Sequence, residues 1–69
     1  MKTQMITAFL QRYTQVNKVD EQINDFGIDY IFEQGICVRI GDEGYEYQGI
    51  DADIWLPLET VSQLRALLK

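Results

Sequence analysis

Residues 27–40 read GIDYIFEQGICVRI, and the alternation within this stretch decides the fold. A period of two is typical of a β-strand, whose successive side chains point to opposite faces. Gln34 and Gly35 separate two alternating runs and supply a turn, because glycine adopts a positive φ at little cost. The stretch therefore predicts an antiparallel hairpin. Its core-facing positions are Ile28, Tyr30, Phe32, Ile36, Val38 and Ile40.

The residues after this hairpin continue the sheet and then end it. A second turn, GDEG at 41–44, is followed by renewed alternation. Because Gly49 marks a bulge or turn, residues 44–56 are expected to form either one bent strand or two. Pro57 ends the sheet, since proline cannot donate a backbone hydrogen bond. On this interpretation one face carries Ala52, Ile54 and Leu56, and the other carries Asp51, Asp53 and Trp55.

Helices are predicted at both ends of the chain. From Lys2 to about Val19, apolar residues recur three or four positions apart, which indicates an amphipathic helix. Residues 20–25 are mostly polar and are expected to form its exit turn. A second apolar stripe, beginning near Leu58, indicates the other helix. Both stripes are buried if they pack on the same sheet face. The sequence therefore predicts an α+β two-layer sandwich in the order α-β-β-β(-β)-α, with an antiparallel sheet of three or four strands and both helices on one face.

The length limits what the chain can stabilise. Its 69 residues correspond to one small domain, 1–69, and 46% hydrophobic with 25% charged residues is typical of a folded globular chain. A domain of this size buries only about 60% of its unfolded surface. Its single cysteine, Cys37, cannot close an internal disulfide. Association with a protein partner, in the simplest case as a homodimer, is therefore the expected reinforcement.

Several kinds of chemistry lack the residues they need. The chain has no histidine, the commonest general base and metal ligand, and it has no glycine-rich nucleotide motif. Asp42 with Glu43, and Asp51 with Asp53, are paired carboxylates without the further ligands of a calcium loop. We therefore expect no catalytic residue, metal site or cofactor. No signal peptide or membrane-spanning apolar run is apparent, and one unpaired cysteine fits a reducing compartment, so a cytoplasmic location is expected.

The net charge of −5 conceals a segregation of charge along the chain. Residues 1–19 carry +3 and residues 60–69 carry +2, whereas residues 20–59 carry −10. The predicted helices are therefore basic, and the segment that contains the sheet is acidic. This balance disfavours direct binding to nucleic acid or to an anionic membrane.

The strand phase places acidic and apolar side chains together on the sheet face opposite the helices, which we call the outer face. An outward Trp55 near Ile31 favours a contact surface, because tryptophan is enriched in binding hot spots. The simpler alternative is a solvated polar face. Cys37 also points outward, and we expect it to be a small apolar filler rather than a reactive thiol, despite the nearby Arg39. The predicted binding surface comprises Asp29, Ile31, Glu33, Arg39, Glu46, Asp51, Asp53 and Trp55.

These observations favour a small, acidic, non-catalytic protein-binding module that acts through its outer face. The expected partner is a protein with a basic surface, such as a nucleic-acid-binding site, which an acidic inhibitor can occupy by imitating phosphates. The alternative is a structural subunit whose main role is assembly of a homodimer or a larger complex. Pairing of two outer faces would bury Ile31, Cys37 and Trp55, but the surrounding acids would oppose it.

Overall fold

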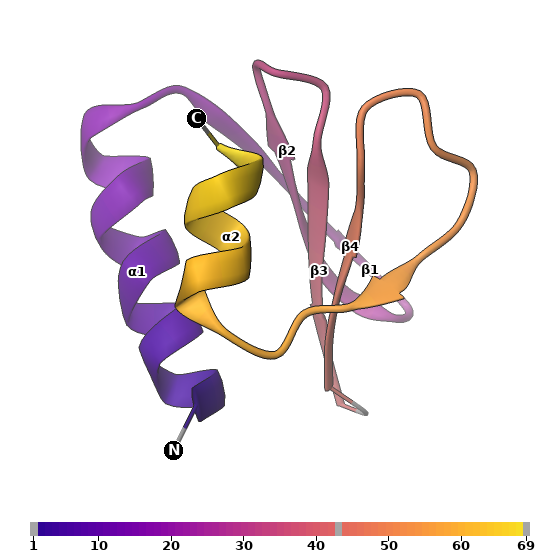
Figure 1. The fold of residues 1–69 in the computed structure, drawn as a ribbon, viewed down its shortest axis with the longest axis horizontal. Coiled ribbons are helices and arrows are strands. Elements are labelled where there is room, and N and C mark those ends of the chain that lie inside the picture. The colour runs from indigo at the N-terminus through magenta and orange to yellow at the C-terminus, as the bar shows by residue number, and fades with distance from the viewer. Residues whose placement is uncertain (1, 43, 69) are drawn as a thin grey trace.

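The chain folds into an antiparallel sheet with helices on one face (Figure 1). The computed structural model describes residues 2–42 and 44–68. Within these residues the sheet has five strands, in the order β1-β2-β3-β4-β5. The elements are α1 (Lys2–Val16), β1 (Val19–Asn24), β2 (Gly27–Phe32), β3 (Cys37–Gly41), β4 (Gly44–Gln48), β5 (Leu56–Pro57) and α2 (Val61–Leu67). The predicted α+β class and helix placement are confirmed, with five strands in place of three or four.

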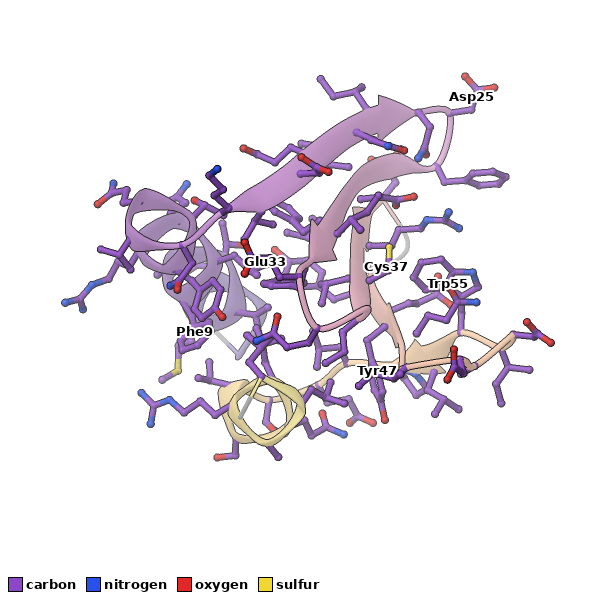
Figure 2. The ribbon with its side chains drawn as sticks, turned by 90° about the horizontal axis from the view of Figure 1, so that it is seen from above. Phe9, Asp25, Glu33, Cys37, Tyr47 and Trp55 are labelled. Atoms are coloured by element: carbon purple, nitrogen blue, oxygen red, sulfur yellow. The ribbon has the colours of Figure 1, made fainter. Side chains whose placement is uncertain are left out.

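The core lies between the helices and the sheet face that they cover, which we call the inner face. Ile6 and Leu10 of α1 and Leu64 of α2 are fully buried there. They pack in one cluster with Phe32 and Val38 of the sheet. Figure 2 shows the helices on one side of the sheet and the side chain of Trp55 on the other. The alternation in residues 27–40 therefore assigned the two faces correctly.

The strand β1 corrects the expectation of an exit turn over residues 20–25. α1 ends at Val16, and β1 pairs along its whole length with β2. Val19 is partly buried, but the other five residues of β1 are exposed. Because backbone hydrogen bonds rather than apolar burial hold this edge strand, hydrophobic alternation gave no sign of it.

The turn between β1 and β2 depends on two residues. The side-chain oxygen of Asn24 accepts a hydrogen bond from the backbone N–H of Phe26 at 2.9 Å, which is a turn typical of asparagine. Gly27 has a φ of 139°, and a Cβ atom there would overlap the carbonyl oxygen of Ile40. Glycine is therefore required at this position, and the turn holds Phe26 beside the sheet.

Residues 49–55 correct the prediction of strand structure beyond Gly49. They form a loop, which starts with a turn in which the Ala52 N–H donates to the Gly49 carbonyl at 3.1 Å. Asp51 in this turn has a positive φ of 58°. β4 and β5 are therefore two separate strands, and the side chains of residues 51–54 belong to a loop instead of a sheet face.

The start of α2 also differs from the prediction. The helix begins at Val61 instead of near Leu58, because Thr60 caps it and Gln63 completes a capping box. The Leu58 N–H donates instead to the Tyr45 carbonyl at 2.8 Å, and the Leu58 side chain is buried in the core.

Candidate protein-binding site

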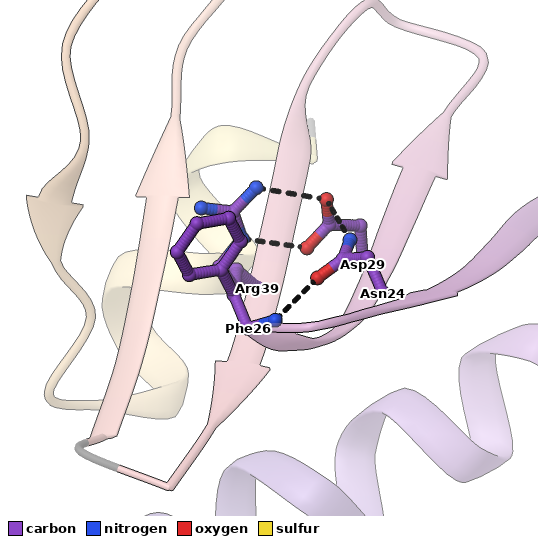
Figure 3. Close-up of polar contacts among 4 residues, drawn as sticks. All are labelled: Asn24, Phe26, Asp29 and Arg39. Atoms are coloured by element: carbon purple, nitrogen blue, oxygen red, sulfur yellow. Dashed lines mark hydrogen bonds and ion pairs between the residues drawn. The ribbon is translucent and has the colours of Figure 1, made fainter.

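The outer face is organised around the side chain of Arg39 on β3. Arg39 lies directly opposite Asp29 of β2 in the sheet register. Its Nε and Nη2 atoms donate to the two carboxylate oxygens of Asp29 at 2.8 and 3.0 Å (Figure 3). The Asn24 amide donates to the same carboxylate at 3.0 Å. Bidentate, charge-assisted contacts of this kind fix both side chains.

Asp29 is therefore neutralised and largely covered rather than offered to a partner. Only 8% of its surface is exposed. The hydrogen bonds from Arg39 hold the pKa of Asp29 below its ordinary value of 3.8, although burial acts in the opposite direction. The pair contributes almost no net charge to the outer face.

Two aromatic rings cover the guanidinium group of Arg39. Its central carbon lies 4.2 Å from the ring centroid of Trp55 and 4.9 Å from that of Phe26. A cation over an aromatic ring is stabilised by about 0.5–2 kcal/mol, depending on its exposure. Trp55 is half-buried by this packing, whereas Phe26 keeps 68% of its surface exposed. Phe26 is therefore the apolar group of this cluster that is most available to a partner.

A shallow pocket lies beside this cluster, at the end of the β3–β4 hairpin. Its volume is about 340 Å³, and it is lined by Asp25, Asp42 and Glu46 together with Phe26 and Arg39. The three lining carboxylates are exposed, whereas the charge of Arg39 is already compensated by Asp29. The pocket is thus negative, with an aromatic wall. Its chemistry suits a lysine or arginine side chain, which combines an apolar stem with a positive group.

The structure brings together four of the eight residues predicted for the binding surface. Asp29 and Arg39 form the ion pair, Trp55 covers it, and Glu46 lines the adjacent pocket. Ile31 lies on β2 and is half-buried, directly opposite Cys37 of β3. Among the predicted binding residues on the outer face, Asp29 differs most from the prediction, because its carboxylate is covered instead of exposed.

The remaining three predicted acids lie elsewhere. Glu33 is exposed in the turn between β2 and β3, after the end of the strand. Asp51 and Asp53 are exposed in the loop 49–55. The assignment of these three acids to the sheet face is wrong. Glu33 lies past the end of β2, and the turn at Gly49 ends the alternation on which the positions of Asp51 and Asp53 depended.

Cys37 is half-buried on the outer face beside the ion pair. Burial raises the pKa of its thiol, and the charge of Asp29 acts in the same direction. Arg39 lowers this pKa, but its effect is smaller. The environment therefore favours the thiol over the nucleophilic thiolate.

Four residues of the site were not singled out as binding residues from the sequence: Asn24, Asp25, Phe26 and Asp42. The sequence does contain a sign of the hairpin turn that holds Phe26. Asn24 and Gly27 enclose two residues, which is the length of a tight hairpin turn. Recognising this turn would have revealed β1 and placed Phe26 at its tip.

No metal site or membrane-spanning segment stands out in the described part of the chain. Over residues 2–42 and 44–68, no three side chains of histidine, cysteine, aspartate or glutamate converge as metal ligands would. The same residues contain no helix with the length and apolar character needed to cross a bilayer. No protein-family model matches the chain, and no curated protein or solved structure matches it either. The function is therefore inferred from the geometry of the outer face.

Proposed function

We propose that this chain is a small, non-catalytic protein-binding module whose outer face receives a basic side chain of a partner protein. The observation that carries the proposal is the pocket beside Phe26. Among the residues that the structure describes, three exposed carboxylates line it, whereas the lining arginine, Arg39, is already paired with Asp29. A lysine or arginine of the partner would meet uncompensated negative charge and an exposed aromatic ring at once.

The pocket is preorganised for such a contact. Phe26 is held by the Asn24 turn, and Arg39 is fixed by Asp29 and Trp55. A site whose side chains are already ordered loses less conformational entropy on binding. This arrangement supports recognition of a defined basic residue over diffuse attraction to any cation.

The partner class that fits is a protein with a basic, partly apolar surface in the cytoplasm. The phosphate-contacting site of a nucleic-acid-binding protein is one such surface, because it presents arginine and lysine side chains. On this proposal the chain acts as an inhibitor that occupies the site. The cytoplasmic location is proposed from the free Cys37, which suits a reducing compartment.

Pairing of two outer faces in a homodimer is the less favoured alternative. Ile31, Cys37 and Trp55 are already half-buried within one chain, so these three side chains offer a second sheet less apolar surface than fully exposed ones would. Around a twofold axis, the exposed acids of the pocket would also approach their symmetry mates.

A fluorescent peptide of arginine residues provides the test, with its binding followed by fluorescence anisotropy at low and high salt. The variant Asp25→Asn, Asp42→Asn and Glu46→Gln removes the charge of the pocket. We expect it to bind at least about tenfold more weakly than the unaltered chain.

The matched control removes three exposed acids outside the pocket, with Asp20→Asn, Glu33→Gln and Glu59→Gln. Both variants have the same net charge, and the control is expected to bind within about twofold of the unaltered chain. Equal weakening in both would show attraction by overall charge and contradict a local site, as would no binding at low salt.

A further inference from the structure

A second surface lies between the two helices, on the opposite side of the core from the outer face. It is an open groove of about 590 Å³. Its apolar lining includes exposed and half-buried side chains of both helices, and its charged lining is basic. Its lining includes Met5, Phe9, Arg12, Val16, Val61 and Arg65.

The groove is lined by apolar side chains together with two arginines, Arg12 and Arg65. Phe9 lies between α1 and α2 in Figure 2 and is half-buried. The guanidinium carbon of Arg65 lies 5.8 Å from its ring centroid. Arg12 is exposed, and none of the described residues that line the groove is acidic. A segment that fills it should therefore present apolar side chains next to carboxylates.

The loop 49–55 of the same chain has this composition. Ile50 and Ile54 are 60% and 62% exposed, and two exposed acids, Asp51 and Asp53, lie between them. The turn closed by Gly49 and Ala52 orders the start of this segment before any contact forms. The loop and the groove are thus complementary in charge, and both expose apolar surface that a soluble small domain ordinarily covers.

The loop cannot reach the groove of its own molecule. Figure 1 shows α1 at one side of the molecule and the loop between β4 and β5 at the other. We propose that the loop 49–55 of one copy docks in the α1–α2 groove of a second copy, placing Ile50 and Ile54 on the apolar floor and Asp51 and Asp53 near Arg12 and Arg65.

This contact is head to tail, because two different surfaces on opposite sides meet. Such an interface leaves a free loop at one end and a free groove at the other, so it does not close at two copies. The proposal goes beyond the binding of a basic partner, since it uses neither Phe26 nor the acidic pocket. The assembly is expected to grow with concentration and to weaken with salt, which screens the exposed charges.

Sedimentation equilibrium of the full chain measures this assembly directly, at concentrations from about 10 μM to about 1 mM. A small contact with a Kd on the order of 100 μM becomes populated in this range. In low salt we expect the average mass to rise from 8.0 kDa to more than twice that value. A mass that stays at 8.0 kDa throughout, or stops at a dimer, would overturn the proposal.

Two variants separate the two surfaces. Met5→Glu with Arg12→Glu disables the groove, and Asp51→Asn with Asp53→Lys disables the loop; asparagine is chosen at position 51 because it tolerates the positive φ. Each variant alone is expected to stay monomeric. Mixed together, they are expected to form one-to-one dimers and nothing larger, because each retains the surface that the other lacks.

Matched controls carry the same changes of charge elsewhere. Gln4→Glu, Gln11→Glu and Gln15→Glu alter α1 outside the groove, and Asp20→Asn with Glu21→Lys alters β1. Both are expected to assemble like the unaltered chain. Assembly that survives in either surface variant, or a mixture that stays monomeric, would overturn the proposal.

Circular dichroism checks folding, and Arg12→Glu alone replaces the groove variant if the double change unfolds it. Arginine-peptide binding should survive in the groove variant, so failure here is distinguishable from failure of the proposed function.

Discussion

The inner and outer faces of the same sheet are held in place by different forces. On the inner face, Val38 and Phe32 are buried in one cluster with apolar side chains of both helices. On the outer face, Arg39 forms an ion pair with Asp29, and its guanidinium group lies over the rings of Trp55 and Phe26. Apolar burial is tolerant of detail, whereas an ion pair depends on register and geometry. The inner face therefore stabilises the fold through apolar burial, and the outer face holds its polar side chains in fixed positions.

The largest effect is expected from truncating the inner face. Leu10 is fully buried in the core cluster, so Leu10→Ala should lower the free energy of unfolding by about 2–5 kcal/mol. Urea denaturation followed by circular dichroism measures this. Val16→Ala, on the exposed part of the same helix, is the control and should change the free energy by about 0.5 kcal/mol or less. Similar losses in both variants would show that the helix is not anchored as described.

A smaller effect is expected from breaking the ion pair on the outer face. Arg39→Met leaves the covered carboxylate of Asp29 without its main partner. Because both side chains retain some contact with water, we expect a loss of about 2 kcal/mol, less than for a fully buried pair. Replacing both residues, with Asp29→Leu and Arg39→Met, should recover most of this loss. A double variant as unstable as the single one would mean that the pair contributes through something other than compensation of charge.

The smallest effect concerns pH. Because the pKa of Asp29 is lowered in the folded chain, the unfolded chain takes up a proton more readily at that carboxyl. The stability that the ionised Asp29 gives to the folded chain is therefore complete above the ordinary pKa of 3.8, and it is lost as the pH falls through the lowered pKa. The difference in free energy of unfolding between the unaltered chain and Asp29→Asn should shrink as the pH falls below 3.8. A difference that stays constant with pH would contradict this assignment, and Asp53→Asn controls for the loss of one charge.

The contrast between the faces also explains what the sequence could predict. Ile28, Tyr30 and Val38 follow the period of a half-buried strand, so the prediction of the hairpin and of its two faces was correct. β1 was missed because its residues are polar and its pairing depends on backbone hydrogen bonds. In residues 49–55 the alternation of side chains is typical of a strand, but a turn that begins at Gly49 ends the pairing there.

The candidate site was predictable only in part for a related reason. Asp29 and Arg39 were both assigned to the outer face from their parity. That they lie directly opposite one another depends on the register between β2 and β3, which the turn sets. Two of the pocket acids, Asp25 and Asp42, lie in different hairpin turns, and the third, Glu46, lies on β4. The three carboxylates therefore come together only in the assembled sheet. Sequence patterns identify faces, whereas pairs and pockets require the register.

On the proposed function, the acidic pocket beside Phe26 binds a basic side chain, and the inner face only supports it. Nuclear magnetic resonance of the isotopically labelled chain, titrated with the arginine peptide, tests this residue by residue. We expect the largest chemical-shift changes at Asp25, Phe26, Arg39, Asp42 and Glu46, and we expect them to disappear at high salt. Shifts centred on α1 and α2, or spread evenly over all exposed acids, would contradict the proposed function.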